Sequence, residues 1–366
     1  MRLLIAGNLA NTGFYIGSKL QNIGIQVDLL MESNPGFESD PRNSGLLSDK
    51  QCPNWIKFYD KTRGWKKNII RIMRKYDLIL SASEYPIFSM LSLKPFIALA
   101  TGSDIIELAQ SNSLKGFLIR LAYSRAKIVI FTFPAQLSYI QKLKIKNYVF
   151  LPLFSRAINS DYKKKNNETK DKFVIFHPTS HIWRVKNNEI FLNAYINLAK
   201  SRDDVFLITI NRGEDAKRST ELLKAGNIEG KYKILPFTLD QKELLDYYLS
   251  SDAIADQFGI GSFGLIGCEV LHIGKPLICY IDIKNYKLLY GESPPVINSN
   301  NSEEMETLLK KLIEDKPYYE KICEDSYKWF KKFHDEEILI KKYIELIAMI
   351  DQRKNTSEII SKLKFC

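Results

Sequence analysis

A glycine-rich stretch near residue 260 constrains the fold of this 366-residue chain more than any other feature. An apolar run at 253–258 precedes four glycines within 259–267, and another apolar run begins at Leu277. This order predicts a buried strand, a tight turn, a helix that begins near Ser262 and a second strand. Because the first amides of a helix lack partners within the helix, the turn is a candidate site for an anion such as phosphate.

Glu269 lies two helical turns beyond Ser262, so it is expected on the same helix face as the glycine-rich turn. Its carboxylate is placed to accept hydrogen bonds from hydroxyl groups attached to a bound phosphate. An ordinary strand–helix–strand crossover, with glycines for close packing and a solvated glutamate, is the alternative that the same residues allow.

The pattern Gly-x-Phe-Gly-Leu-x-x-x-Glu-x-x-x-x-Gly-Lys-Pro at 261–276 resembles the donor-sugar signature of the retaining GT-B glycosyltransferases of family four, the bacterial group 1 enzymes. Asp256-Gln257 ahead of it resembles one bacterial branch of that family. The family usually has two glutamates in this signature, and Gly261 stands at the first of these positions. Asp256 is the nearest acidic substitute. The resemblance implies a GT-B fold, in which two doubly wound, Rossmann-like α/β domains face each other across a cleft.

Predicted strands alternate with predicted helices both before and after a charged, polar stretch that ends at residue 172. This alternation also predicts two α/β domains. The expected N-terminal, acceptor-side domain is 1–155, the linker is 156–172, and the nucleotide-sugar domain is 173–335. The resemblance implies that 336–366 holds a helix that crosses back to the first domain, and the segment 351–366 is expected to fray. Strands are expected at 2–6, 25–31, 76–81, 95–100, 127–132, 148–151, 173–176, 205–210, 233–237, 253–258 and 277–281, and helices at 14–23, 187–200, 240–250, 262–273 and 338–350.

The segment 177–187, which follows the first strand of the second domain, resembles the family's loop that reaches the nucleotide diphosphate. Lys186 matches the lysine of the family's Lys-Gly pair, Asn187 stands in place of the glycine, and either His181 or Arg184 replaces the usual arginine. The other donor-binding residues that the resemblance implies are Gly13, Phe237, Asp256, Gly261, Ser262, Phe263, Gly264, Leu265 and Glu269.

Two predicted strand ends in the first domain carry the acidic residues Glu84 and Asp104. Ligands of open α/β sheets bind at the carboxyl ends of strands, so both residues are candidates to bind the acceptor or the transferred sugar. Asp104 joins Glu269 and Lys186 in the expected catalytic set, although capping of the next helix explains Asp104 equally well. The long polar loop 32–51 is expected to help hold the acceptor.

The net charge of +11 is concentrated in the first half, where residues 1–150 hold 20 Lys and Arg against 10 Asp and Glu. The densest part, 57–75, reads as a basic helix with an apolar stripe. Such a helix either lies on an anionic membrane surface or covers the domain core. Charge alone does not argue for nucleic acid, and none is expected. Without a membrane-spanning run or a signal-peptide pattern, the expected location is the cytoplasm, at or near the inner face of the membrane.

Together these features predict a hexosyltransferase-type enzyme. It would move a sugar from a nucleotide-diphosphate sugar to a glycan or lipid-linked acceptor, in bacterial surface polysaccharide synthesis, and the resemblance implies that the transfer proceeds with retention. The resemblance implies that the enzyme needs no metal or other cofactor, and the sequence has no Asp-x-Asp motif. A nucleotide-sugar epimerase of GT-B shape and a catalytically silent partner of a glycosylation complex are the alternatives.

Overall fold

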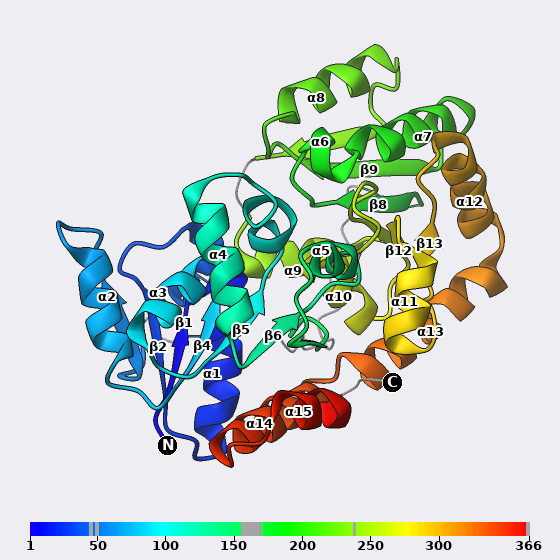
Figure 1. Cartoon of the computed structure of the whole chain (residues 1–366). Coiled ribbons are helices and arrows are strands. Elements are labelled where there is room, and N and C mark those ends of the chain that lie inside the picture. The colour runs from blue at the N-terminus through cyan, green and yellow to red at the C-terminus, as the bar shows by residue number, and fades with distance from the viewer. Residues whose placement is uncertain (44–46, 48–50, 155–168, 170, 237–238, 364–366) are drawn as a thin grey trace. The chain divides into compact units, whose positions relative to one another are not determined.

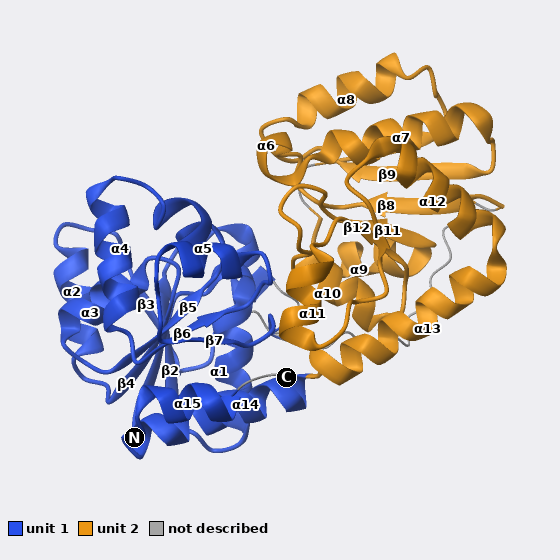
Figure 2. Ribbon diagram, turned by 45° about the vertical axis from the view of Figure 1, so that its right-hand side comes forward, with its two compact units in different colours: residues 1–155, 336–366 blue, residues 156–335 orange. Residues whose placement is uncertain are grey.

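The computed structural model describes residues 1–43, 47, 51–154, 169, 171–236 and 239–363, and these divide between two compact units (Figures 1 and 2). Unit 1 comprises 1–155 and 336–366, and unit 2 comprises 156–335. Each unit is built on one parallel sheet with helices on its faces, as the α/β prediction requires. Most of the expected linker 156–172 lies outside the described residues, as does Phe237.

Unit 1 contains a seven-stranded sheet in the order β3-β2-β1-β4-β5-β6-β7. The strands are β1 (Leu3–Ala6), β2 (Val27–Glu32), β3 (Ile56–Tyr59), β4 (Leu78–Ala82), β5 (Phe96–Ala100), β6 (Ile128–Phe131) and β7 (Tyr148–Phe150). The helices are α1 (Thr12–Asn22), α2 (Trp65–Met73), α3 (Tyr85–Ser92), α4 (Leu114–Arg125) and α5 (Gln136–Lys142), with short helical turns η1 (Leu9–Asn11), η2 (Phe37–Ser39), η3 (Pro41–Asn43) and η4 (Asp104–Leu108). The strand order reverses between β1 and β4.

Unit 2 contains a six-stranded sheet in the order β10-β9-β8-β11-β12-β13. The strands are β8 (Phe173–His177), β9 (Val205–Ile210), β10 (Tyr232–Leu235), β11 (Ala253–Ala255), β12 (Leu277–Cys279) and β13 (Ile297–Asn298). The helices are α6 (Trp183–Lys186), α7 (Asn188–Ser201), α8 (Ala216–Ala225), α9 (Gln241–Ser250), α10 (Leu265–His272), α11 (Ile283–Tyr290), α12 (Ser302–Glu314) and α13 (Lys316–Phe333). Here the strand order reverses between β8 and β11.

The last two helices, α14 (Glu336–Asp351) and α15 (Thr356–Leu363), belong to unit 1. α14 contacts α1, and α15 contacts β7. Ile359 and Leu363 are fully buried in the same apolar core as the first strand. The expectation that the end of the chain frays is therefore wrong for 356–363, because this segment buries apolar side chains that an unpaired terminus would leave exposed.

The basic segment 57–75 is not one helix. It contains β3, a loop and α2, and Gly64 adopts a left-handed φ of 86° immediately before the helix. In α2, Ile69 and Met73 are fully buried while Lys66 and Lys67 are exposed, so the apolar stripe covers the core. Among the described residues, no helix is long and apolar enough to cross a membrane.

Candidate active site

Both sheets reverse their strand order at a point where two neighbouring strands send their chains to opposite sides. In open α/β sheets, such a point opens a crevice at the carboxyl ends of the two strands, and ligands bind there. In unit 2 this reversal point lies between the segments that follow β8 and β11, which contain Lys186 and the glycine-rich turn. In unit 1 it lies between the segments that follow β1 and β4.

Lys186 and the glycine-rich turn lie against each other in unit 2. The Lys186 carbonyl accepts a 2.7 Å hydrogen bond from the Phe258 amide, and its Nζ donates a 2.5 Å bond to the Thr179 hydroxyl. Burial raises the pKa of the Asp256 carboxyl, while the nearby Lys186 ammonium opposes that rise. The Lys186 ammonium, the buried Asp256 carboxylate and the start of α10 therefore lie close together, as expected of segments that follow neighbouring parallel strands.

Asn187 supports the placement of Lys186. Its backbone is left-handed, with φ 48° and ψ 42°, between α6 and α7. Glycine takes this conformation most readily, and asparagine is among the few other residues that do so at modest cost. Asn187 thus replaces the glycine of the Lys-Gly pair without changing the backbone path that the turn needs.

Close packing of Gly259 fixes the turn to the segment that carries Lys186. A Cβ atom at Gly259 would lie 2.1 Å from the Val185 carbonyl oxygen. Gly261 has a left-handed φ of 72°, and its carbonyl accepts a 2.9 Å bond from the Asp282 amide. These two glycines are required by geometry, one for the close approach and one for the backbone angle.

The start of α10 differs from the expectation. The helix begins at Leu265, three residues later than Ser262, because the left-handed backbone at Gly261 keeps the turn irregular. The Gly264 amide donates a 3.0 Å bond to the Asp256 carboxylate. In this structure the carboxylate occupies that amide, and the role of Gly264 as a phosphate donor stays a prediction.

The side chains of Ser262 and Phe263 do not face an open site. Ser262 is fully buried, and its Oγ lies 3.1 Å from the Tyr286 hydroxyl. Phe263 is buried and packs against the rings of Tyr286 and Trp329. A Cβ at Gly267 would lie 2.5 Å from that of Phe263, so this glycine makes room for the ring. If Ser262 and Phe263 contact the donor, they do so through backbone atoms, because both side chains are buried.

Glu269 lies in the second turn of α10 and is only 8% exposed. A carboxylate in such a place is costly unless it is hydrogen-bonded or paired, which sets it apart from a solvated surface glutamate. Its role toward donor hydroxyls stays a prediction.

His181 and Arg184 are placed very differently. His181 is buried, with Nε2 3.1 Å from the Thr209 hydroxyl, and burial lowers its pKa to about 4. Arg184 is exposed, with Nε 4.0 Å from a carboxylate oxygen of Glu214. A neutral His181 does not supply the positive charge of the family's arginine, so Arg184 is the better placed of the two.

The buried His181 predicts a loss of stability in acid. Its pKa is lowered from 6.5 to about 4 on folding, so between these values the unfolded chain binds the extra proton. The stabilising contribution is complete above pH 6.5 and is lost as the pH falls toward 4. Relative to His181→Gln, the wild-type protein should lose about 2 to 3 kcal/mol of unfolding free energy between pH 7 and pH 4.5. Urea unfolding at both pH values measures this, and an equal pH dependence for the two proteins would contradict it.

A cavity of about 640 Å³ occupies the reversal point of unit 1. The segment after β1 contributes Gly7 to Leu9, and the segment after β4 contributes Ser83 to Tyr85. The end of β2, the segment that follows it up to Ser39, the segment 103–111 and Lys115 of α4 also contribute to the lining. Glu84 and Asp104, the two acidic residues that the sequence analysis selected, both lie in this lining. The role of either residue toward an acceptor stays a prediction.

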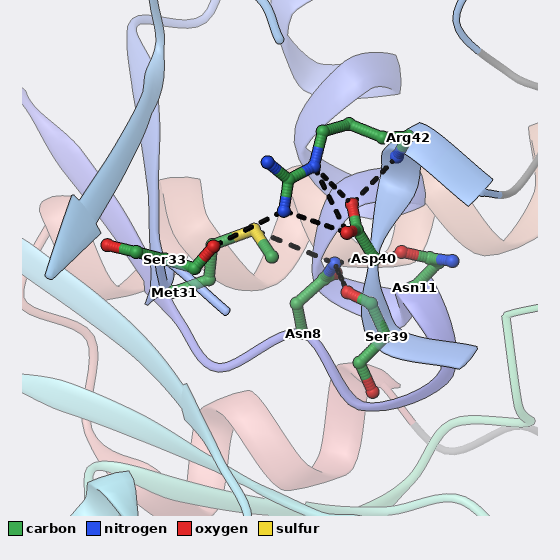
Figure 3. Close-up of polar contacts among 7 residues, drawn as sticks. All are labelled: Asn8, Asn11, Met31, Ser33, Ser39, Asp40 and Arg42. Carbon is green, nitrogen blue, oxygen red and sulfur yellow. Dashed lines mark hydrogen bonds and ion pairs between the residues drawn. The ribbon is translucent and has the colours of Figure 1, made fainter. Parts of the chain in front are cut away.

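The wall formed by 33–43 is tied to the first loop by side-chain amides (Figure 3). Asn8 donates to the Ser39 carbonyl at 2.8 Å, and Asn11 donates to that of Glu38 at 3.1 Å. Arg42 holds both carboxylate oxygens of Asp40 at 2.8 to 3.0 Å. Pro35, Gly36 and Ser39 of the long polar loop line the cavity, and these hydrogen bonds tie the loop to the first loop of the unit.

Asp104 is held by the local backbone. Its carboxylate accepts hydrogen bonds of 2.8 to 3.0 Å from the amides of Thr101, Gly102 and Ile105, and one of 3.0 Å from the Tyr123 hydroxyl. Burial raises the pKa of this carboxyl, and these bonds oppose the rise. The geometry favours a structural role in the 101–105 segment, because little of the carboxylate is left for a ligand. Asp104 does not cap η4 as expected, since the N-cap residue of that helix is Ser103.

Gly13 lies buried in the first turn of α1. A Cβ at this position would lie 2.4 Å from the Gly7 carbonyl oxygen, so packing against the first loop already requires glycine. Its predicted contact with the donor is not needed to explain the residue.

Several residues of the two crevices were not predicted from the sequence. Thr179, the partner of Lys186, is one of them, and the cavity-lining Glu107 and Lys115 are two more. Thr179 follows β8 by two residues, so its position just beyond a strand end was the available signal. Among the described residues, no group of three or more His, Cys, Asp or Glu side chains is placed to hold a metal ion.

Comparisons with known proteins identify the fold. Residues 158–329 match the sequence model of the family described as glycosyl transferases group 1. An uncharacterized glycosyltransferase of Haemophilus influenzae is 25% identical over 221 residues, which make up 60% of this chain and 59% of the relative. The match therefore spans less than two thirds of that relative's length.

Two solved structures share the whole fold. Anabaena Alr3699/HepE, in complex with UDP-glucose, superposes with a TM-score of 0.74 at 15% identity, over 95% of this chain and 99% of the other. A Listeria monocytogenes protein described as a candidate UDP-N-acetylglucosamine 2-epimerase gives 0.65 at 10% identity, over 97% and 98%. The predicted fold class is confirmed: the chain consists of two Rossmann-like α/β domains, as in GT-B proteins.

Proposed function

We propose that this protein is a glycosyltransferase that moves a hexose, with retention, from a nucleotide-diphosphate sugar to a glycan or lipid-linked acceptor, in bacterial surface polysaccharide synthesis. The observation that carries the proposal is the meeting of Lys186, Asp256 and the start of α10 at the reversal point of the unit 2 sheet. The family match over 158–329 supports it. Retention rests on the resemblance of 261–276 to the donor signature of retaining enzymes.

The proposed chemistry follows from where charge develops. As the nucleotide diphosphate departs, negative charge accumulates on its oxygens while the sugar carbon becomes oxocarbenium-like. The Lys186 ammonium and the start of α10 stabilise the leaving group, and Arg184 is the second candidate cation. Glu269 holds hydroxyl groups of the donor. In this scheme the leaving phosphate accepts the proton of the acceptor hydroxyl, and the protein supplies no metal.

Entry of the diphosphate requires a rearrangement at Gly264. Its amide is bonded to the Asp256 carboxylate, so a phosphate oxygen that takes this amide displaces the carboxylate from it. The buried Asp256 then relies on Lys186 and Thr179 for compensation, because an unpaired buried charge is costly. This gives Asp256 a positioning role in the donor site.

Contact with an anionic membrane is part of the proposal and rests on charge. Because the apolar stripe of α2 faces the core, such contact would use exposed side chains, among them Lys66, Lys67 and Arg71. Its expected signature is salt-sensitive binding to vesicles that contain phosphatidylglycerol.

Calorimetric titration of the full chain with UDP, GDP and ADP tests the donor site. We expect UDP to bind most tightly, since the Anabaena protein of the same fold is described in complex with UDP-glucose. Transfer is then followed with the matching nucleotide sugar and mass analysis of the products. An epimerised donor would instead favour the epimerase suggested by the Listeria likeness, and nucleotide binding without turnover would favour a silent partner.

Replacing Glu269 by glutamine should slow sugar transfer about 10- to 150-fold, the range that corresponds to one lost charge-assisted hydrogen bond. The free nucleotide should bind nearly as before if the lost partner is a sugar hydroxyl. Steady-state rates and UDP titration separate the two effects, with Glu229→Gln as a surface control. If a folded Glu269→Gln variant transfers sugar at the wild-type rate, Glu269 does not contact the donor.

A further inference from the structure

The segments that lead into five neighbouring strands of unit 1 are strongly basic. In the parallel order β1-β4-β5-β6-β7 these segments meet at the amino edge of the sheet, opposite the edge that holds the cavity. They span 1–2, 74–77, 91–95, 125–127 and 142–147, and together they form the amino-edge patch. The patch contains a single acidic residue, Asp77, and nine cations: Arg2, Arg74, Lys75, Lys94, Arg125, Lys127, Lys142, Lys144 and Lys146. Most of the excess of basic over acidic residues in 1–150 therefore lies at this edge.

The nine cations are open to solvent. Lys94 is partly exposed, and the other eight are exposed. Within the part of the chain that the structure describes, none of the nine side chains forms an ion pair. The carboxylate of Asp77 accepts a 2.7 Å hydrogen bond from the Arg2 amide. The positive charge of the patch is therefore presented to the surroundings and is not neutralised within the unit.

Two exposed leucines stand at the middle of the amino-edge patch. The third of the five strands is β5, and the segment before it contains Leu91, which is 45% exposed, and Leu93, which is 85% exposed. Leu93 also has a left-handed φ of 61°, an angle that a bulky side chain seldom adopts. The stability of the fold therefore does not explain a leucine at position 93. The patch has an apolar centre with cations on both sides.

This combination matches the surface of an anionic bilayer. Ammonium and guanidinium groups are attracted to lipid phosphates, while exposed apolar side chains enter the boundary between headgroups and acyl chains. Five adjacent strands, about 4.8 Å apart, give the patch a width of roughly 20 Å. A nucleic acid duplex would attract the same cations through its phosphates, but its backbone offers no apolar surface to the leucines.

We propose that the amino-edge patch is the surface through which unit 1 docks on an anionic phospholipid bilayer, with Leu93 inserted among the lipids and the cations on headgroup phosphates. The choice of a membrane as partner rests on the proposed function, whereas the location of the contact rests on the patch itself. Because α2 ends at Arg74, inside the patch, the exposed lysines of this helix add to the same field. The cavity lies at the other edge of the sheet, so the docked unit keeps the cavity open to water.

Co-sedimentation of the full chain with vesicles tests the docking. We expect binding to vesicles that contain phosphatidylglycerol at about 0.1 M salt, release at about 1 M, where the Debye length falls to about 3 Å, and little binding to pure phosphatidylcholine. Replacing Lys142, Lys144 and Lys146 together by glutamine should weaken binding about 100-fold, from the usual contribution of a cation near an anionic surface. Leu93→Ser should weaken it about tenfold through the lost apolar insertion.

A matched triple variant separates the patch from net charge. Lys316, Lys321 and Lys328 are exposed on α13, and their joint replacement by glutamine removes the same charge from unit 2. This control should bind vesicles within about threefold of wild type. The proposal is overturned if both triple variants lose the same affinity while circular dichroism shows native folds. It is also overturned if the wild-type protein does not bind the anionic vesicles, or if it binds a DNA duplex in their place.

The docking surface and the proposed function can fail separately. A Lys66→Gln/Lys67→Gln variant reports on α2, and UDP titration with product analysis reports on the unit 2 site without vesicles. If the α2 variant loses vesicle binding and the Lys142, Lys144 and Lys146 variant does not, the membrane contact of the proposed function stands and the amino-edge patch is wrong. Vesicle binding through the patch in a protein that neither binds nucleotides nor transfers sugar would leave the inference standing and remove the function.

Discussion

Replacing Lys186 by methionine is expected to lower the rate of sugar transfer about 100- to 1000-fold, the usual cost of removing one group that stabilises developing charge. Methionine keeps the length and apolar volume of the side chain and removes the ammonium. Since Lys186 Nζ bonds to Thr179 and lies near the buried Asp256, it sits where the turn and the start of α10 converge. The measurement is the single-turnover rate with saturating nucleotide sugar.

Two further variants sharpen the Lys186 experiment. Lys186→Arg keeps the charge with a different shape and should recover part of the rate. Lys200→Met removes an exposed lysine at the end of α7 and should have no effect on transfer. A Lys186→Met protein with native circular dichroism and a rate within threefold of wild type would show that the leaving group is stabilised by other residues.

Replacing Gly259 by alanine should destabilise the protein by about 2 to 3 kcal/mol and should also slow transfer. The new methyl carbon would lie 2.1 Å from the Val185 carbonyl oxygen, so one of the two backbones must move. Because the neighbouring residues Phe258 and Lys186 are joined by a 2.7 Å backbone hydrogen bond, that movement also displaces Lys186, the proposed cation of the donor site. Stability is measured by urea unfolding and transfer by steady-state rates.

Gly36→Ala is the matched control for Gly259→Ala. Gly36 has a φ of −59°, which any residue adopts, and no atom lies within 4 Å of the added carbon. Its stability should stay within about 0.5 kcal/mol of wild type, as for most surface substitutions. If both glycine variants unfold at the same urea concentration, the close approach of the turn to Val185 is not a source of strain.

The fold and the rough position of the site follow from local patterns. Apolar runs marked most strands of both sheets, and residues that follow β8 and β11 are brought together by the pairing of those two strands. Lys186 and Asp256, which the family resemblance selected, are far apart in the sequence and lie close together for this reason. Parallel pairing makes such meetings predictable, because the carboxyl ends of neighbouring strands share one edge.

Side-chain direction was less predictable. Phe263 resembles a donor-site residue in sequence, but its ring is held by Tyr286 of α11 and Trp329 of α13, two segments that no local pattern places beside it. The basic run 57–75 concealed β3, since Ile56 and Tyr59 are the only residues of that four-residue strand that are buried. The many charged residues of 57–75 determined the helix prediction, and two buried positions were too few to indicate a strand.

The left-handed backbone at Gly261 limits what can replace this glycine. A glutamate there, as in the family signature that 261–276 resembles, would force a side chain into a φ of 72°, which costs such a residue roughly 1 to 2 kcal/mol. An added carboxylate at this position would therefore come with a loss of stability unless a second substitution relaxed the turn. Engineering a second acidic residue into this turn thus requires a change of backbone path as well as of side chain.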